Sequence, residues 1–536
     1  MKSFPDIILY NGNIRTQDDT HPMAQAIAIS GNQILSLGSD KDVLPLSSKH
    51  TNVIDLNKRL VLPGFIDTHF HFYEWALNYD SIDLSNASTF KEMTDAVATK
   101  VLTLEKGNWV LGQGFNESEW PENKIPDRYD LDKIAPDNPV CIWRCDLHLS
   151  VVNSLGLKLA GIDSSSPDPE DGVIEKDANG HPTGVLKELA SNLIRNILPE
   201  LSHVTLLENI QKAIIDAHRL GLTSIHDIRL MGGLDGADAL KAWQSLRLKN
   251  RLNIRCHVAL PGEMTDQAIN LGIITGFGDD LLKIGYLKFF SDGGMGARTG
   301  WMTQKYLDAD YGMPLTPVAQ IERDVLKADQ AGLSVMVHAI GDMANKEIID
   351  MFTRIENRGR TRCSIPHRIE HVQMILPEDL ETLSKLKNIA VSCQPNNLSL
   401  DISMIDECAG PRGKYAYALK SILKTGVPMM LSSDAPVADP NPLAGIYSAV
   451  TRKRMDHTPE KGWYMEQALS VDQAVKGYTI TPALASGCGD RIGSISAGKL
   501  ADMIVLDQDI FNIDQDAIPD TRVDMTIFDG RIVYEK

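Results

Sequence analysis

The chain has 536 residues, of which 43% are hydrophobic and 23% are charged, a composition that excludes a disordered or fibrous protein. Lysine and arginine number 53 against 71 acidic residues, and no run of like charge concentrates the net charge of −18. This acidic balance argues against a nucleic-acid partner, and the length predicts two or three domains.

The N-terminal segment Met1–Asp6 lacks an apolar stretch of signal-peptide length, and no segment approaches the roughly 20 apolar residues of a membrane span. The seven cysteines are scattered, and Cys141 and Cys145 have no second close pair to complete a zinc cage. Buried free thiols in a reducing compartment are the simpler interpretation. We therefore expect a cytoplasmic protein without a membrane partner.

Short strands separated by turn residues are predicted at both ends of the chain. Asn-Gly and Gly-Asn dipeptides between apolar runs are typical of hairpins. Neither end has enough strands for a stable sandwich alone, so residues 1–62 and 487–536 are expected to pair into one small β-sandwich domain. The predicted strands are 7–10, 26–29, 33–37, 502–507, 525–528 and 531–534.

Between these ends, apolar strand runs alternate with stretches compatible with helices, such as 213–220, which stops at Gly221. Eight strands that alternate with helices predict a (β/α)₈ TIM-type barrel of class α/β, formed by residues 63–83 and 201–486. The strands are expected at 64–67, 223–226, 253–258, 285–290, 334–338, 368–371, 389–393 and 428–434.

The spacing is interrupted once, after the first barrel strand. Residues 84–200 are far too many for a loop between a strand and a helix, and they carry a strand of their own at 140–144. Long insertions at the C-terminal face of a barrel usually shape the entrance of the substrate site. We expect this α/β insertion to do so here.

Five residues that can bind a metal stand at the C-terminal ends of predicted barrel strands. His69 and His71 are two apart and can point to the same side, while His338, His371 and Asp434 each end a further strand. Taken singly, each has a plainer interpretation, such as a buried histidine with a hydrogen-bond partner or, for Asp434, a helix N-cap. Together on four strand ends they indicate a metal site.

Lys288 lies on the fourth predicted barrel strand, on the opposite face from its neighbours Leu287 and Phe289. Burial there would depress the lysine pKa below its reference of about 10.4. Two interpretations remain open. The ammonium pairs with an inward carboxylate, or the neutral amine captures carbon dioxide and becomes a carbamate that bridges two divalent ions.

At this point the chain resembles the metal-dependent amidohydrolase superfamily, and within it the YtcJ-like branch (amidohydrolase family 3), which includes N-substituted formamide deformylases. The resemblance covers essentially the whole chain. The segments that carry it are 62–71, 287–299, 337–342, 368–371, 431–436, 481–483 and 493–502.

The resemblance implies that His69 and His71, with Asp434, hold the more buried of two ions, most often zinc, and that His338 and His371 hold the more exposed one. It further implies that carboxylated Lys288 bridges the two ions. An activated water then attacks a carbonyl carbon, and Asp434 passes the proton of that water to the leaving nitrogen.

Four further residues are candidate substrate contacts. Asp292 and Arg298 lie in a glycine-rich loop after Lys288, where backbone N–H groups and the guanidinium can meet a substrate anion, although a tight turn with a surface arginine is an equal interpretation. His148 resembles a family segment that faces the site from the insertion, with Leu147 in place of its glycine. Trp120 is one of several aromatic residues that suggest an apolar part of the pocket.

The sequence therefore predicts a metal-dependent hydrolase of non-peptide C–N bonds in an amide, N-acyl or N-formyl group, with a small-molecule substrate and a homodimer as the expected assembly. One alternative is a mononuclear ring deaminase of the same superfamily, against which Lys288 counts. The other, from a different class, is a barrel that has lost catalysis and serves as a scaffold.

Overall fold

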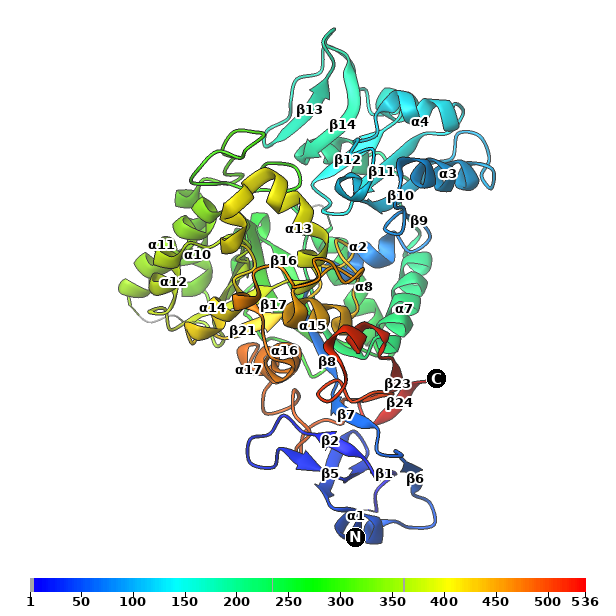
Figure 1. The fold of residues 1–536 in the computed structure, drawn as a ribbon, viewed down its shortest axis with the longest axis vertical. Coiled ribbons are helices and arrows are strands. Elements are labelled where there is room, and N and C mark those ends of the chain that lie inside the picture. Colours follow the sequence, from blue (N-terminus) through cyan, green and yellow to red (C-terminus); the bar gives the residue numbers. More distant parts are fainter. Residues whose placement is uncertain (1–3, 234, 360–361) are drawn as a thin grey trace.

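Eight parallel strands form a nearly closed barrel in the middle of the molecule (Figure 1). The computed structural model describes residues 4–233, 235–359 and 362–536, so residues 1–3 of the first predicted domain lie outside the described part. Every neighbouring pair in the barrel sheet is parallel. The strands are β8 (Phe65–Phe70), β15 (Leu222–Asp227), β16 (Arg255–Pro261), β17 (Leu282–Phe290), β18 (Val335–Ala339), β19 (His367–His371), β20 (Ile389–Cys393) and β21 (Met429–Leu431).

The barrel closes through the segments that follow β8 and β21. The backbone N–H of Asp434 donates to the carbonyl of His69 at 2.8 Å, and the N–H of His71 donates to the carbonyl of Ala435 at 2.8 Å. The predicted (β/α)₈ barrel is therefore confirmed. These bonds also fix the first and last strand ends to each other at the face where the sequence places the site.

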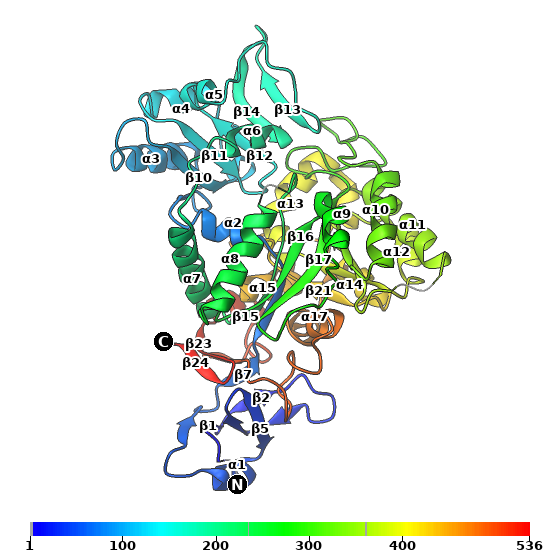
Figure 2. The same cartoon turned by 180° about the vertical axis from the view of Figure 1, so that it is seen from behind.

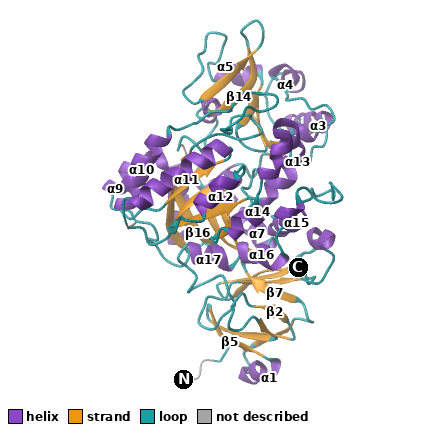
Figure 3. Ribbon diagram, turned by 60° about the vertical axis from the view of Figure 1, so that its left-hand side comes forward, coloured by secondary structure: helices purple, strands orange, loops and turns teal. Residues whose placement is uncertain are grey.

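Helices cover the outside of the barrel (Figure 3). Helix α7 shows how the sequence sets the ends of such a helix. Ser202 caps its N-terminus by accepting from the N–H of Thr205, and the helix stops before Gly221, whose φ of +79° favours glycine. Its buried side chains recur every three or four residues. The covering helices include α7 (His203–Arg219), α8 (Gly236–Leu248), α10 (Val318–Gln330), α11 (Asp342–Asn357), α12 (Pro377–Leu383), α13 (Pro395–Ala409), α15 (Pro442–Thr451), α16 (Val471–Gly477) and α17 (Ile480–Ala485).

The two chain ends build one β domain at the lower end of the molecule in Figure 1, as predicted. Strand β22 from the C-terminal end pairs antiparallel with β7 from the N-terminal end, and the core between the two sheets contains Ile27, Val61, Met503 and Ile527. One sheet contains β1 (Ile7–Tyr10), β4 (Ala26–Ser30), β5 (Gln33–Gly38) and β6 (Asn52–Asp55). The other contains β2 (Asn13–Arg15), β3 (Met23–Ala24), β7 (Leu60–Pro63), β22 (Met503–Leu506), β23 (Val523–Phe528) and β24 (Arg531–Glu535).

The insertion lies at the opposite end of the barrel from the β domain (Figure 1). It contains a six-stranded mixed sheet, whereas the sequence predicts a single strand there. Glycines and polar residues interrupt the apolar alternation of the other strands, so their pattern is weak. The sheet contains β9 (Ile82–Asp83), β10 (Val110–Phe115), β11 (Val140–Arg144), β12 (Leu149–Val152), β13 (Gly172–Lys176) and β14 (Pro182–Glu188), flanked by α3 (Phe90–Val101), α4 (Arg128–Ile134), α5 (Ser154–Leu159) and α6 (Asn192–Arg195). No helix in the described ranges is long and apolar enough to cross a bilayer.

One buried ion pair joins the barrel to the β domain. Arg255 on β16 donates to Asp502 at 2.6 and 2.9 Å and to Asp529 at 3.0 Å, and the side chains of Arg255 and Asp502 are each 4% exposed. Arg255→Ala is expected to lower the free energy of unfolding by about 3–5 kcal/mol, because it leaves a buried carboxylate without its partner. Urea denaturation measures this loss.

The matched control is Arg354→Ala, since Arg354 also pairs with a carboxylate, Glu322 at 2.9 Å, but is 46% exposed. Arg354→Ala is expected to lower the free energy of unfolding by about 1 kcal/mol or less. Equal effects of the two substitutions would contradict the assigned role of the Arg255 pair.

Candidate metal centre

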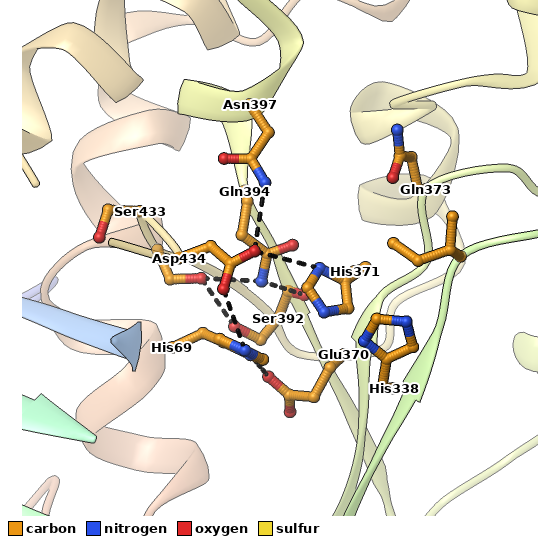
Figure 4. Close-up of polar contacts among 12 residues, drawn as sticks. His69, His338, Glu370, His371, Gln373, Ser392, Gln394, Asn397, Ser433 and Asp434 are labelled. Atoms are coloured by element: carbon orange, nitrogen blue, oxygen red, sulfur yellow. Dashed lines mark hydrogen bonds and ion pairs between the residues drawn. The ribbon is translucent and has the colours of Figure 1, made fainter. Parts of the chain in front are cut away.

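The barrel brings the five predicted strand-end ligands together at its C-terminal face, and Figure 4 shows four of them, His69, His338, His371 and Asp434. His69 is the last but one residue of β8, and His71 is the N-cap of the following helix. His338 and His371 lie on β18 and β19, and Asp434 follows β21. All five are buried. The ring centroids are 4.8 Å apart for His69 and His371, and 4.5 Å apart for His338 and His371.

Asp434 is the centre of this group. Its Oδ1 lies 3.3 Å from His69 Nε2 and 3.4 Å from His71 Nε2, and its Oδ2 lies 3.9 Å from His371 Nδ1. The amide of Asn397 donates to Oδ2 at 3.3 Å. Asp434 and His371 have φ values of +63° and +70°, a strained conformation for residues other than glycine that clusters at functional sites.

The contacts of His69 indicate which of its two ring nitrogens carries the proton. Its Nδ1 lies 2.5 Å from Glu370 Oε2, and Arg368 donates to the same carboxylate at 2.9 Å. Burial raises the pKa of Glu370 against the opposing charge of Arg368. We assign the proton to His69 Nδ1 because Arg368 contacts both Glu370 oxygens, at 2.8 and 2.9 Å, which is the arrangement of an accepting carboxylate. Burial also holds the pKa of His69 well below its usual range. The Nε2 lone pair of a neutral ring therefore faces the Asp434 carboxylate.

Two acceptors 3.3 Å apart are stabilised by a cation beside them, a role open to the neighbouring Lys288 Nζ, 3.5 Å from His69 Nε2, or to a bound metal ion. In the described part of the chain, Asp434 Oδ1 and His71 Nδ1 have no hydrogen-bond partner of good geometry. One ligand atom each from His69, His371 and Asp434 can be chosen so that all lie within 4.8 Å of one another. This donor set of imidazole and carboxylate fits a divalent transition metal such as zinc.

Lys288 adjoins the group from β17. It is 2% exposed, and its Nζ lies 3.5 Å from His69 Nε2 and 4.7 Å from the centre of the Phe290 ring. Burial lowers the pKa of Lys288 to about 8. A fraction of the side chain is therefore the neutral amine near neutral pH.

These residues form the floor of a cavity of about 600 Å³, its opening included. Side chains from the insertion supply part of the wall, so the insertion shapes the entrance to the site. The lining residues from the insertion are Asp146, Leu147, His148, Glu188, Leu189, Ser191, Asn192 and Arg195.

Comparison with known proteins agrees with this geometry. Residues 52–534 match the model of the Amidohydrolase family. The chain belongs to the amidohydrolase family. This finding confirms the resemblance seen in the sequence and makes the protein a member of a superfamily of metal-dependent hydrolases.

The amidohydrolase is similar over nearly its whole length to several known proteins. It is 31% identical over 533 residues to the putative amidohydrolase YtcJ of Bacillus subtilis (strain 168), with 99% of each chain covered. It is 27% identical over 550 residues to the N-substituted formamide deformylase of Arthrobacter pascens, covering 100% of this chain and 99% of the relative. Among solved structures, an uncharacterized metal-dependent hydrolase from Pyrococcus horikoshii OT3 superimposes with a TM-score of 0.75 at 26% identity, covering 95% of this chain and 99% of that chain.

Of the four predicted substrate contacts of the amidohydrolase, His148 lines the cavity. Its Nδ1 lies 2.7 Å from Glu188 Oε2, and its ring centre lies 5.8 Å from that of His338. Burial disfavours the imidazolium, but the Glu188 carboxylate outweighs it and raises the pKa of His148 to about 9. The ring therefore presents a positive charge to the cavity at neutral pH.

Asp292 is fully buried below the floor of the site. Its carboxylate accepts from the backbone N–H groups of Ile340 at 3.0 Å, Gly341 at 2.8 Å and Trp301 at 2.8 Å, and it lies 3.7 Å from His338 Nε2. Burial raises the pKa of Asp292 to about 7. Asp292 thus holds the loops around His338 in place and does not line the cavity.

The two other predicted contacts are placed outside the cavity. Arg298 donates to Asp308 at 2.7–3.1 Å, which satisfies the guanidinium that was expected to meet a substrate anion. Trp120 is 3% exposed in the core of the insertion, where its Nε1 donates to the carbonyl of Ala87 at 2.7 Å. Both side chains are held by partners from their own part of the chain.

Glu370 and Arg368, which orient His69, were not predicted as site residues from the sequence. They are two residues apart on β19 and point to the same side, so a pair of opposite charges within a buried strand was the available signal. Arg368 also donates to the carbonyl of Thr68 at 2.7 Å and lies 2.8 Å from His226 Nδ1. A chain of polar contacts therefore runs from His69 into the barrel interior.

Glu370→Gln is expected to weaken metal binding by about 10–100-fold, because an amide no longer fixes the His69 tautomer as a carboxylate does. Competition with a chromogenic chelator measures the affinity. Glu381→Gln is the matched control, since Glu381 is 74% exposed and pairs only with Lys385 at 2.8 Å in the described part of the chain. Unchanged affinity in Glu370→Gln would contradict the orienting role.

Proposed function

We propose that this amidohydrolase is a binuclear zinc hydrolase that cleaves an amide, N-acyl or N-formyl C–N bond of a small molecule. The observation that carries the proposal is the convergence of His69 Nε2 and His71 Nε2 on the Asp434 carboxylate, at 3.3 and 3.4 Å, on the floor of an open cavity. When bound, the metal ions supply Lewis acidity that activates a water molecule and polarises a carbonyl group.

His69, His71 and Asp434 are the proposed ligands of the more buried ion, and His338 and His371 those of the more exposed one. His338 donates from Nε2 to the carbonyl of Gly293, 3.3 Å away, which leaves its Nδ1 lone pair for a ligand. Lys288 is the proposed bridge after its neutral amine has added carbon dioxide. Its burial and its contact with His69 support that role.

Asp434 is the proposed proton carrier. Burial opposes its ionisation, yet the surrounding histidines lower the pKa of Asp434, so it is an ionised base. Asn397 holds Oδ2, while Oδ1 faces the imidazoles, so the carboxylate keeps one orientation at the edge of the cavity. It accepts the proton of the attacking water and delivers it to the leaving nitrogen, since an amine leaves poorly unless it is protonated.

The chemistry of the cavity wall supports a substrate that carries a polar group beside an apolar part. His148 presents positive charge and a hydrogen-bond donor, whereas Leu147, Leu189 and Phe290 are apolar. The similarity to an N-substituted formamide deformylase supports small N-acyl groups, formyl among them.

A screen with zinc-loaded protein tests the proposal. N-formyl, N-acetyl and N-carbamoyl derivatives of amines and amino acids are incubated with the protein, and the released amine is quantified. Release of amine with two zinc ions per chain supports the proposal. One ion per chain together with ammonia release from ring amidines would favour the mononuclear deaminase, which the compact group of His69, His371 and Asp434 also fits.

A further inference from the structure

A second cluster of reactive side chains lies at the opposite end of the barrel from the metal centre. It borders a cavity of about 260 Å³, its opening included, where the first residues of β16 and β17 meet the segment after α17 (Figure 2). Cys488, Lys283 and His257 line this cavity. The cavity gives small molecules a route to a thiol that is itself only 4% exposed.

The three side chains are in direct contact. Lys283 Nζ lies 3.2 Å from Cys488 Sγ, and His257 Nε2 lies 3.5 Å from the same sulfur. In the described ranges no carboxylate forms an ion pair with Lys283, so the thiol is its closest polar partner. Other cysteines differ: Cys363 contacts the Asp329 carboxylate at 3.3 Å, and no cysteine besides Cys488 hydrogen-bonds to a lysine among the described residues.

Two nitrogen-bearing side chains flank the sulfur, Lys283 at 3.2 Å and His257 at 3.5 Å. Burial lowers the pKa of His257 to about 3, so its ring is neutral and shares a hydrogen bond with the thiol at 3.5 Å. A thiolate is the form of cysteine that reacts with oxidants. Lys283 Nζ lies 3.2 Å from the sulfur, close enough for a single oxygen atom to bridge the two.

We propose that Cys488 and Lys283 form a reversible N–O–S bridge when the protein is oxidised by dioxygen. The S–H bond and one N–H bond break, one oxygen atom forms bonds to both sulfur and nitrogen, and the other leaves as water. Sulfur and nitrogen each lose two electrons, which accounts for the four electrons that dioxygen accepts. The bridge joins two positions 205 residues apart and so ties β17 to the segment that leads into the β domain.

Peptide mapping of the full-length protein tests the proposal. After incubation in air, a peptide that contains Cys488 is expected to be linked to one that contains Lys283, with a mass about 14 Da above the sum of the two, from one oxygen gained and two hydrogens lost. A thiol reductant should release both peptides. Oxygen added to Cys488 alone, without a link to Lys283, would overturn the proposal, as would a reduced Cys488 after oxidation with peroxide.

Two variants and a control sharpen the assignment. Lys283→Arg keeps the positive charge and Cys488→Ser keeps the size, and both are expected to lose the linked species, whereas Cys363→Ser is expected to retain it. Oxidised wild-type protein should also melt at least about 3 °C above reduced protein, because the bridge restricts the unfolded chain. This difference should vanish in Lys283→Arg. A shift that persists in Lys283→Arg would contradict the bridge even if one variant folds poorly.

Discussion

Prolonged dialysis against a chelator is expected to abolish hydrolysis by this amidohydrolase, and added Zn²⁺ is expected to restore it. The reason is that the groups around Asp434 are arranged as ligands, with His69 Nε2, His71 Nε2 and His371 Nδ1 at 3.3–3.9 Å from its carboxylate oxygens. Without a cation, neither water activation nor carbonyl polarisation remains, and each supplies several kcal/mol of transition-state stabilisation. The measurement is the rate of amine release before dialysis, after it and after titration with zinc.

The control is dialysis against the chelator already saturated with zinc, which exposes the protein to the same compound without removing metal. Circular dichroism of the dialysed protein checks that the barrel remains folded. Full activity in protein shown by atomic spectroscopy to be free of metal would refute the proposed mechanism. Partial recovery with one equivalent of zinc and full recovery with two would support a binuclear centre.

Asp434→Asn is expected to reduce turnover by at least about 10²-fold when metal is saturating. Asparagine keeps the size of the side chain and can still accept from Asn397 through its amide oxygen, so the loop after β21 should keep its shape. It cannot carry a proton at neutral pH. The loss should therefore appear in kcat, measured with the substrate that the screen identifies.

Asp439→Asn is the matched control, since Asp439 follows in the same segment but is exposed and accepts from the backbone N–H of Asn441 at 2.9 Å. Its turnover should stay close to that of the unmodified protein. Metal content separates two roles of Asp434: a variant that binds two ions yet turns over slowly has lost the proton carrier. Near-normal turnover in Asp434→Asn would reject that role.

The barrel could be predicted from the sequence because its strands are buried on both faces. Such strands are continuous apolar runs, and the ligands stand where those runs end, so His338 and Asp434 were predicted from position alone. The insertion could not be predicted in the same detail. Its strand β14 contains Gly184 at φ +94°, where a Cβ atom would lie 2.3 Å from the carbonyl of Val152. This backbone constraint leaves no hydrophobic pattern.

The substrate contacts were predicted less well because long loops place them. His148 reaches the cavity through a hydrogen bond to Glu188, which is 40 residues away in the chain. The ion pair with Asp308 holds Arg298 outside the cavity, and packing in the core of the insertion holds Trp120 outside it. Local sequence does not show which of these tertiary partners a side chain meets. Glu370 was missed because a carboxylate inside a strand is also compatible with a purely structural ion pair.

Contacts among the polar side chains inside the barrel limit which substitutions the chain can accept during evolution. His69, Glu370, Arg368 and His226 are joined by contacts of 2.5–2.9 Å, and His226 stacks on His257 with ring centres 4.6 Å apart. Replacing one of these residues leaves its neighbour with a buried charge or donor that has lost its partner. These positions are therefore expected to vary together among descendants of this chain, so that its interior evolves in linked steps while the aliphatic residues outside the barrel drift independently.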